Sequence, residues 1–317
     1  MYYFKAKCFL IIFFIKNTID IFTATGDDTK EYSIVYCTDD NYTIPTLVSM
    51  LSAIKNLKNG YRINFYIVVS RKSFSEKTQC IFKDFNDEYK DFCNVIVKKI
   101  DDYPEWIIKY YAVLTKKWPV ETLFRLLLPD LFKEIDKCLY LDSDTLVVGD
   151  FSTLYDMDFD NNYIIGVKDL NFESHNNTLG VRSYINAGVI LMNLRKIRNG
   201  FRNDFNKGIL EVLDKYRNSY TSLDDFCSGV LYYPDQNILN IIFNKKIKHV
   251  SKKYNYSGSL EPDQVIIHFY ISNKPWRNKS VNGAKEWWNY YNELYKKGYF
   301  WNRKCCRCCR CCRIKLR

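Results

Sequence analysis

The segment Cys138-Leu-Tyr-Leu-Asp-Ser-Asp-Thr-Leu-Val147 places two carboxylates directly after a continuous apolar run. The run predicts a buried strand, and open α/β sheets bind ligands beyond the carboxyl ends of their strands. Asp142 and Asp144 can converge on one point once the strand gives way to a turn, and their oxygens suit Mn²⁺ or Mg²⁺ bound to phosphates. Short acidic pairs also occur as solvated turns, so this segment alone leaves both interpretations open.

Strands and helices alternate on both sides of this segment. Strands are predicted at Tyr32–Cys37, Arg62–Ser70, Asn94–Ile100, Lys137–Leu141, Tyr163–Val167, Ile185–Asn193 and Val265–His268. Helices are predicted from Pro45 through Leu57 and at Ser73–Phe85, Pro119–Phe132, Phe201–Tyr216 and Asp235–Phe243. This alternation predicts a single Rossmann-like α/β domain with a mostly parallel sheet covered on both faces. We place it at residues 31–282, between an N-terminal extension (1–30) and a C-terminal tail (283–317).

Composition narrows the function classes. Of 317 residues, 47% are hydrophobic and 26% charged, which excludes a wholly disordered chain. The net charge is +11, but residues 283–317 carry +8 of it and the remainder only +3. A nucleic-acid binder is therefore disfavoured, because the basic excess is confined to the tail and no recognition motif appears.

The tail mixes aromatic with basic residues, beginning at Trp287-Trp288 and continuing to Trp301. This composition favours docking on an anionic membrane surface, although the aromatics could instead pack on the domain. The run Cys305–Cys312 allows three interpretations: a soft-metal site, palmitoylation, or a drifted repeat without a role.

The N-terminal 25 residues hold an apolar octet, Cys8–Ile15, which is too short to span a bilayer. A surface extension is favoured, with a signal peptide as the alternative. Six scattered cysteines predict small buried thiols in a reducing compartment: Cys8, Cys37, Cys80, Cys93, Cys138 and Cys227. We therefore expect a cytoplasmic protein, peripheral at the inner face of the membrane.

A second polar segment, His268-Phe-Tyr-Ile-Ser-Asn-Lys-Pro-Trp276, follows the apolar strand that ends at His268. A lone histidine in such a place is more often a structural hydrogen-bonding group than a ligand. With two carboxylates, however, an imidazole makes a mixed nitrogen and oxygen set compatible with Mn²⁺. Lys274 adds a cation that could reach a diphosphate.

These two segments and three others together resemble glycosyltransferase family 8, whose members are retaining nucleotide-sugar enzymes with the A-type (GT-A) fold. The other three regions are the loop ending at Tyr42, the helix carrying Arg125, and the later part of the chain, which holds two separate motifs, Asn186-Ala-Gly188 and Asp235-Gln236. The sequence is similar in particular to bacterial lipooligosaccharide and lipopolysaccharide galactosyl- or glucosyltransferases. The resemblance spans Tyr32 to Trp276.

The resemblance implies a function and a set of site residues. It implies transfer of glucose or galactose from UDP-glucose or UDP-galactose to a glycan or glycolipid, with Mn²⁺, or Mg²⁺ as the alternative ion, held by Asp142, Asp144 and His268. Implied nucleotide-sugar-binding residues are Cys37, Thr38, Asp39, Asn41, Tyr42, Arg125, Asp142, Ser143, Asp144, Asn186, Ala187, Gly188, Asp235, Gln236 and Lys274. Implied catalytic residues are Gln236, Asp235 and Asp169. Because glutamine is a poor nucleophile, the implied route is front-face departure and attack, with the leaving phosphate accepting the acceptor's proton.

One position departs from the family pattern. The family often has glycine three residues after the histidine, where this chain has Ile271. A β-branched residue is costly if that backbone needs a positive φ, so the loop and the Lys274 contact could differ here. A non-catalytic, membrane-associated protein that binds a nucleotide sugar or a metal is therefore the alternative hypothesis.

Overall fold

The computed structural model describes residues 30–299 apart from 59, 116, 170–178, 183, 220–231, 257, 259 and 260. At its centre lies a seven-stranded sheet in the order β3-β2-β1-β4-β7-β6-β8. The strand pairs β2–β3, β1–β2, β1–β4 and β6–β8 are parallel, whereas β7 is antiparallel to both β4 and β6. The predicted α/β fold with a mostly parallel mixed sheet is confirmed.

The strands are β1 (Lys30–Cys37), β2 (Tyr61–Ser70), β3 (Cys93–Ile100), β4 (Lys137–Leu141), β5 (Thr145–Val147), β6 (Ile164–Lys168), β7 (Ile185–Asn193), β8 (Ile247–Val250) and β9 (Ile266–His268). The α-helices are α2 (Thr43–Asn56), α3 (Glu76–Glu88), α4 (Glu105–Leu114), α5 (Leu128–Leu131), α6 (Ser152–Tyr155), α8 (Leu194–Gly200), α9 (Phe205–Asn218), α11 (Pro234–Ile242) and α12 (Ala284–Lys296). Short 3-10 helices are η1 (Asp40–Tyr42), η2 (Arg71–Ser73), η3 (Val120–Leu126) and η5 (Lys252–Tyr254).

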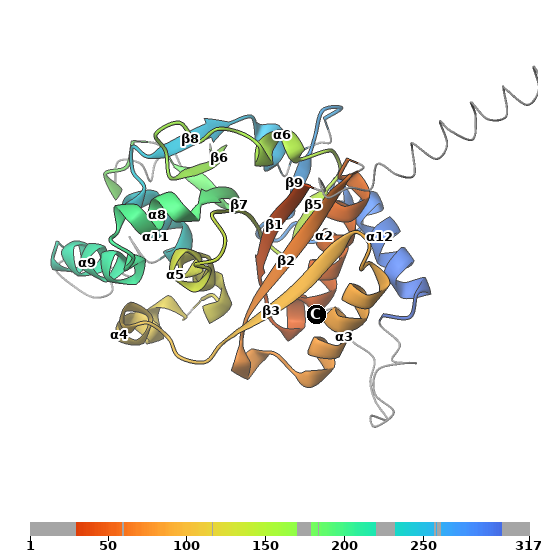
Figure 1. Ribbon diagram of the computed structural model, residues 1–317, viewed down its shortest axis with the longest axis horizontal. Helices are drawn as coiled ribbons and strands as arrows, with labels where there is room; N and C mark the ends of the chain where they lie inside the picture. The colour runs from red at the N-terminus through yellow and green to blue at the C-terminus, as the bar shows by residue number, and fades with distance from the viewer. Residues whose placement is uncertain are drawn as a thin grey trace, which may run out of the picture.

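Helices cover both faces of the sheet and enclose two apolar cores (Figure 1). One core lies under α2, α3 and α12, and the other under α4, η3, α5, α8, α9 and α11. Trp287 and Leu294 of α12 are fully buried in the first core. The aromatic residues at the start of the basic segment therefore pack against the domain.

A second, two-stranded sheet brings distant parts of the chain together. Its strands β5 and β9 are antiparallel, with Thr145 opposite His268. The predicted strand at Val265–His268 thus exists, but it lies outside the main sheet. This pairing sets the histidine beside the turn that follows β4.

Two predicted helices are wrong in form. Residues 119–132 were expected as one helix, but they form η3 followed by α5. Pro129 lies in the first turn of α5, where its missing N–H breaks no helical hydrogen bond, whereas inside one continuous helix it would interrupt the hydrogen-bond ladder. Residues 201–216 begin their helix only at Phe205, since Arg202 and Asn203 have φ of 53° and 62°. Helix α4 was not predicted, although Trp106, Ile107 and Tyr110 bury one face of it.

Several sequence-based expectations fall outside the described residues: those for residues 1–25, Cys8, Cys227 and the run Cys305–Cys312. Of the other cysteines, Cys37, Cys93 and Cys138 are buried and Cys80 is half-buried, and these four form no disulfide. Burial raises the pKa of the Cys93 thiol to about 12, which keeps it protonated and unreactive. Among the helices of the described part, none is long and apolar enough to cross a bilayer.

Candidate active site

A cavity of about 490 Å³ opens where β1 and β4 end at their carboxyl ends. Its lining includes most of the predicted site residues: Cys37, Thr38, Asp39, Tyr42, Arg125, Asp142, Ser143, Asp144, Asn186, Gly188, Asp235, Gln236, His268 and Lys274. Asn41, Asp169 and Ala187 are close by but outside this lining. The position agrees with the rule that ligands bind at strand carboxyl ends in open α/β sheets.

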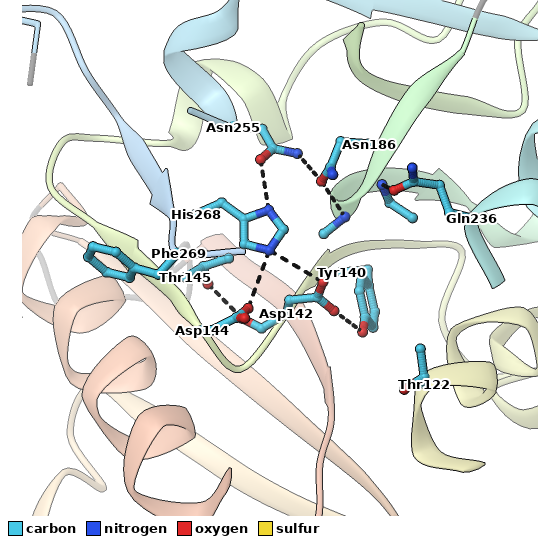
Figure 2. Close-up of polar contacts among 12 residues, drawn as sticks. Thr122, Tyr140, Asp142, Asp144, Thr145, Asn186, Gln236, Asn255, His268 and Phe269 are labelled. Atoms are coloured by element: carbon cyan, nitrogen blue, oxygen red, sulfur yellow. Dashed lines mark hydrogen bonds and ion pairs between the residues drawn. The ribbon is translucent and has the colours of Figure 1, made fainter. Parts of the chain in front are cut away.

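Asp142, Asp144 and His268 form a potential metal site at the floor of this cavity. Their ligand atoms all lie within 4.8 Å of one another. His268 Nε2 is 3.3 Å from Asp144 Oδ1 and 3.5 Å from Asp142 Oδ2 (Figure 2). Two carboxylates and one imidazole are a donor set that suits Mn²⁺, so these residues fit the implied metal.

The orientation of His268 is fixed from behind by Asn255. His268 Nδ1 lies 3.0 Å from Asn255 Oδ1, and Asn255 Nδ2 donates to Asn186 Oδ1 at 2.9 Å (Figure 2). Because the amide nitrogen of Asn255 donates to Asn186, the amide oxygen of Asn255 is the atom that accepts from His268 Nδ1–H. The unprotonated Nε2 then faces the two carboxylates, as a metal-ligating histidine requires. Sequence reasoning missed Asn255, which lies in a loop of unremarkable composition.

Because Gly188 has no side chain, it leaves room for the imidazole ring of His268. A Cβ built on Gly188 would lie 2.0 Å from His268 Cε1, far inside any normal contact. The Gly188 carbonyl also accepts from the Asp142 backbone N–H at 2.8 Å. Strand β7 therefore approaches both metal-ligating segments at a residue without a side chain.

Arg125 of η3 is buried and links three parts of the site. It donates from Nη2 to Asp142 Oδ1 at 2.8 Å and from Nη1 to the Ala187 carbonyl at 2.6 Å, and its Nε is 3.1 Å from Asp235 Oδ2. Burial alone would lower its pKa, but the nearby carboxylates raise it above the usual value, so the guanidinium stays charged. Tyr140, also missed from sequence, donates to Asp142 Oδ1 at 2.7 Å.

Lys274 is buried and pairs with Asp144, while its ammonium also donates to the Phe269 carbonyl at 2.6 Å. Burial alone would raise the pKa of Asp144. The Lys274 ammonium, together with the hydrogen-bonding contact of the His268 ring, outweighs burial and holds that pKa well below the usual range. Asp144 is therefore an anion at neutral pH, and Lys274 is poised beside the point where a metal would sit.

The start of α11 holds Gln236 rigidly. Its Oε1 accepts from the Ala187 backbone N–H at 2.9 Å, and its Nε2 donates to the Tyr184 hydroxyl at 3.2 Å. Burial raises the pKa of the neighbouring Asp235, an effect that Arg125 partly offsets. Asn240, one turn further on, exchanges two hydrogen bonds with Ile185 of β7. This end of α11 is thus fastened to β7 by side-chain amides.

The loop after β1 forms the other end of the cavity. Asp39 caps η1, accepting from the Tyr42 backbone N–H at 2.9 Å and from Asn41 Nδ2 at 3.2 Å. Asp39 therefore closes this turn with its own side chain. The Tyr42 ring meets Trp276 edge to face, with centroids 6.0 Å apart. Lining residues that sequence reasoning missed include Trp118, Glu121, Tyr233 and Arg277.

Ile271, the departure from the family pattern, does adopt a positive φ of 57°. The expectation that the loop could avoid this conformation is wrong. The Lys274 ammonium pairs with Asp144 in this loop conformation, and its contact with a diphosphate stays a prediction.

Comparison with known proteins shows the family to which the chain belongs. Residues 33–280 match the family described as "Glycosyl transferase family 8". The chain belongs to this family and is a glycosyltransferase. It is 29% identical over 268 residues to a putative glycosyltransferase of Haemophilus influenzae, covering 78% of this chain and 73% of that one.

Two named relatives agree with this assignment, and one solved structure has a similar fold. The chain is 24% identical to a lipopolysaccharide 1,2-glucosyltransferase of Escherichia coli (84% and 79% covered). It is 27% identical to a lipopolysaccharide 1,3-galactosyltransferase of Salmonella typhimurium (83% and 78% covered). Its fold matches galactosyltransferase LgtC in complex with donor and acceptor sugar analogs, with a TM-score of 0.68 and 23% identity over 84% of this chain and 99% of that one.

Proposed function

We propose that the protein is a retaining, metal-dependent hexosyltransferase that moves glucose or galactose from a UDP-sugar to a glycan or glycolipid acceptor. The observation that carries this proposal is the cluster of Asp142, Asp144 and His268 in one cavity with two buried cations, Arg125 and Lys274. The names of the glucosyl- and galactosyltransferase relatives support a hexose donor.

In this proposal Asp142, Asp144 and His268 hold Mn²⁺, with Mg²⁺ as the alternative ion. When bound, the metal supplies Lewis-acid stabilisation of the leaving diphosphate. Lys274 exchanges its contact with Asp144 for the diphosphate, and Arg125 orients Asp142 and faces the donor. At the other end Asp39 and Tyr42 receive the uridine, with Cys37, Thr38 and Asn41 beside them.

The reacting groups lie at the α11 end. Asp235 holds sugar hydroxyls, Asn186 and Gly188 face the transferred sugar, and Asp169 positions donor or acceptor. The bond from the anomeric carbon to the diphosphate breaks, a bond to the acceptor oxygen forms, and the acceptor's proton passes to the leaving phosphate. Both polar atoms of the Gln236 amide are already hydrogen-bonded, which supports an orienting role for it over a nucleophilic one.

The test is UDP release from UDP-glucose and UDP-galactose with Mn²⁺. The Asp142→Asn/Asp144→Asn variant is expected to lose at least 100-fold in rate, since two of three protein ligands lose their charge. Asp91→Asn, at an exposed turn, is the matched control. Normal activity of the double variant would contradict the metal assignment, and UDP binding without turnover would favour the non-catalytic alternative.

We further propose that the C-terminal segment docks the protein on the inner face of an anionic membrane. The exposed Lys285 and Lys296 on α12 support this. Replacing both by glutamine is expected to weaken binding to phosphatidylglycerol vesicles about tenfold or more, at ~1 kcal/mol per cation. Lys207→Gln/Lys215→Gln, on exposed lysines of α9 at the opposite end of the molecule from α12 (Figure 1), should leave it unchanged. Equal binding to duplex DNA would contradict the assignment to lipid.

A further inference from the structure

The loop after β9 makes a tight turn at an unfavourable residue. The Asn273 backbone N–H donates to the Tyr270 carbonyl at 3.3 Å, and Ile271 between them has a φ of 57°. This region is costly for a β-branched side chain. The turn sends the chain back so that Lys274 reaches Asp144 and the Phe269 carbonyl. Ile271 therefore accepts strain in a turn that positions a buried cation.

The Ile271 side chain is also unusually exposed. It borders the cavity and is 60% accessible to solvent, and the neighbouring Ser272 and Asn273 are exposed too. Glycine would relieve the backbone strain, and a polar residue would suit the water. An apolar side chain that is both strained and exposed at the rim of a site points to a ligand contact.

The course of the loop tells which end of the cavity Ile271 borders. Tyr270, just before it, packs against His268 with ring centroids 5.4 Å apart. Trp276, after Lys274, packs against Tyr42. The loop thus runs from the metal ligands toward the proposed uridine end, and Ile271 precedes Lys274 on the metal side. In the proposed front-face route the acceptor passes its proton to the leaving phosphate, so the acceptor hydroxyl has to lie beside the diphosphate that the metal ligands would help to hold, on this side of the cavity.

We propose that Ile271 is a specificity residue for the acceptor, packing against the apolar C–H face of the acceptor's sugar ring. The inference rests on the proposed function. One isoleucine followed by two exposed polar residues, Ser272 and Asn273, offers a small apolar patch, which suits one face of a sugar ring better than the length of an acyl chain.

The test compares Ile271→Val with Ile271→Thr. Both are β-branched and nearly identical in shape, so they make the same demand on the turn and differ only in a hydroxyl group. With lactose, octyl β-glucoside and octyl β-galactoside as acceptors, the acceptor KM is expected to be about three- to tenfold higher for Thr than for Val, since a hydroxyl is poorly accommodated in an apolar contact. UDP affinity and kcat should be equal in the two variants.

Ile271→Gly serves as a second variant, because it relaxes the backbone and is expected to fold at least as well while raising the acceptor KM. Equal acceptor KM values for Val and Thr, with normal UDP release, would overturn the inference alone. A difference in UDP affinity as large as that in acceptor KM would also overturn it, by placing Ile271 on the donor. Absence of turnover in the unaltered protein would instead overturn the proposed function.

Discussion

Replacement of Gly188 by alanine tests how the site holds His268. The added Cβ would lie 2.0 Å from His268 Cε1, 2.6 Å from Nδ1 and 2.7 Å from Nε2. Carbon atoms in contact prefer separations of about 3.5–4.0 Å, so the ring has to move by roughly 1.5–2 Å. The ring is only 2% exposed and bonded to Asn255, so it cannot move without losing that bond.

Two consequences of Gly188→Ala can be measured. Overpacking of this kind costs about 1–3 kcal/mol in the free energy of unfolding. Displacement of Nε2 from the carboxylates is expected to weaken Mn²⁺ binding about 10- to 100-fold, the range seen when groups that orient metal ligands are lost. Calorimetric titration with Mn²⁺ in the presence of UDP gives the second quantity, and chemical unfolding gives the first.

Gly60→Ala separates steric displacement from backbone strain. Gly60 has a φ of 85° and no atom within 4 Å of the added Cβ. Its replacement should cost ~1–2 kcal/mol of strain and leave Mn²⁺ binding unchanged.

The Gly188→Ala/His268→Ala variant should be more stable than the sum of the single changes predicts, because removing the ring removes the clash. If Gly188→Ala binds Mn²⁺ within twofold of the unaltered protein, the steric argument fails.

Three further predictions concern groups around the cavity. Asn255→Ala is expected to weaken Mn²⁺ binding about 10- to 100-fold by freeing the His268 ring, and unchanged calorimetric affinity would contradict this. Lys274→Met should tighten Mn²⁺ binding in the absence of UDP, because the ammonium competes with the metal for the Asp144 carboxylate. The same variant should weaken UDP binding, because the proposed contact between the ammonium and the diphosphate is lost. A loss of both affinities would refute the competition. Burial raises the pKa of the Glu121 carboxyl, so the folded state holds its proton more strongly and loses stability as pH rises above about 4. Glu121→Gln should therefore stabilise the protein against denaturant more at pH 7 than at pH 4, with each value compared with the unaltered protein at the same pH. The control Glu31→Gln, at an exposed carboxyl, should show no such difference.

Local patterns in the sequence were enough to predict most of the sheet. β4 and β7 have their predicted bounds, and the predicted strands at β1, β2, β3 and β6 differ by one or two residues at an end, because long apolar runs give a strong signal. β5 and β8 escaped prediction. They are short, and their pairing partners are far away in sequence, so no local period marks them.

The site was predicted in a different way. Asp142 and His268 carry recognisable chemistry at strand ends, and the family resemblance joined them across more than 120 residues. Asn255 and Tyr140 gave no such signal, since an asparagine in a loop and a tyrosine in a strand are ordinary residues. Their importance comes only from the partners that tertiary packing gives them, and no pattern within one segment contains that information.

The pairing of β5 with β9 explains why the metal-ligating residues meet at all. Thr145 lies opposite His268, so Asp144, one residue earlier, falls beside the imidazole. Side chains alternate between the faces of a strand, and a slip of one residue would turn His268 away from the carboxylates. Two further backbone hydrogen bonds hold the β5–β9 pair in register. The Phe269 N–H donates to the Asp144 carbonyl at 2.9 Å, and the His268 N–H donates to the Tyr256 carbonyl at 2.8 Å. The geometry of the site is therefore set by backbone pairing first, and the side chains of Asn255 and Lys274 act on an arrangement that already exists.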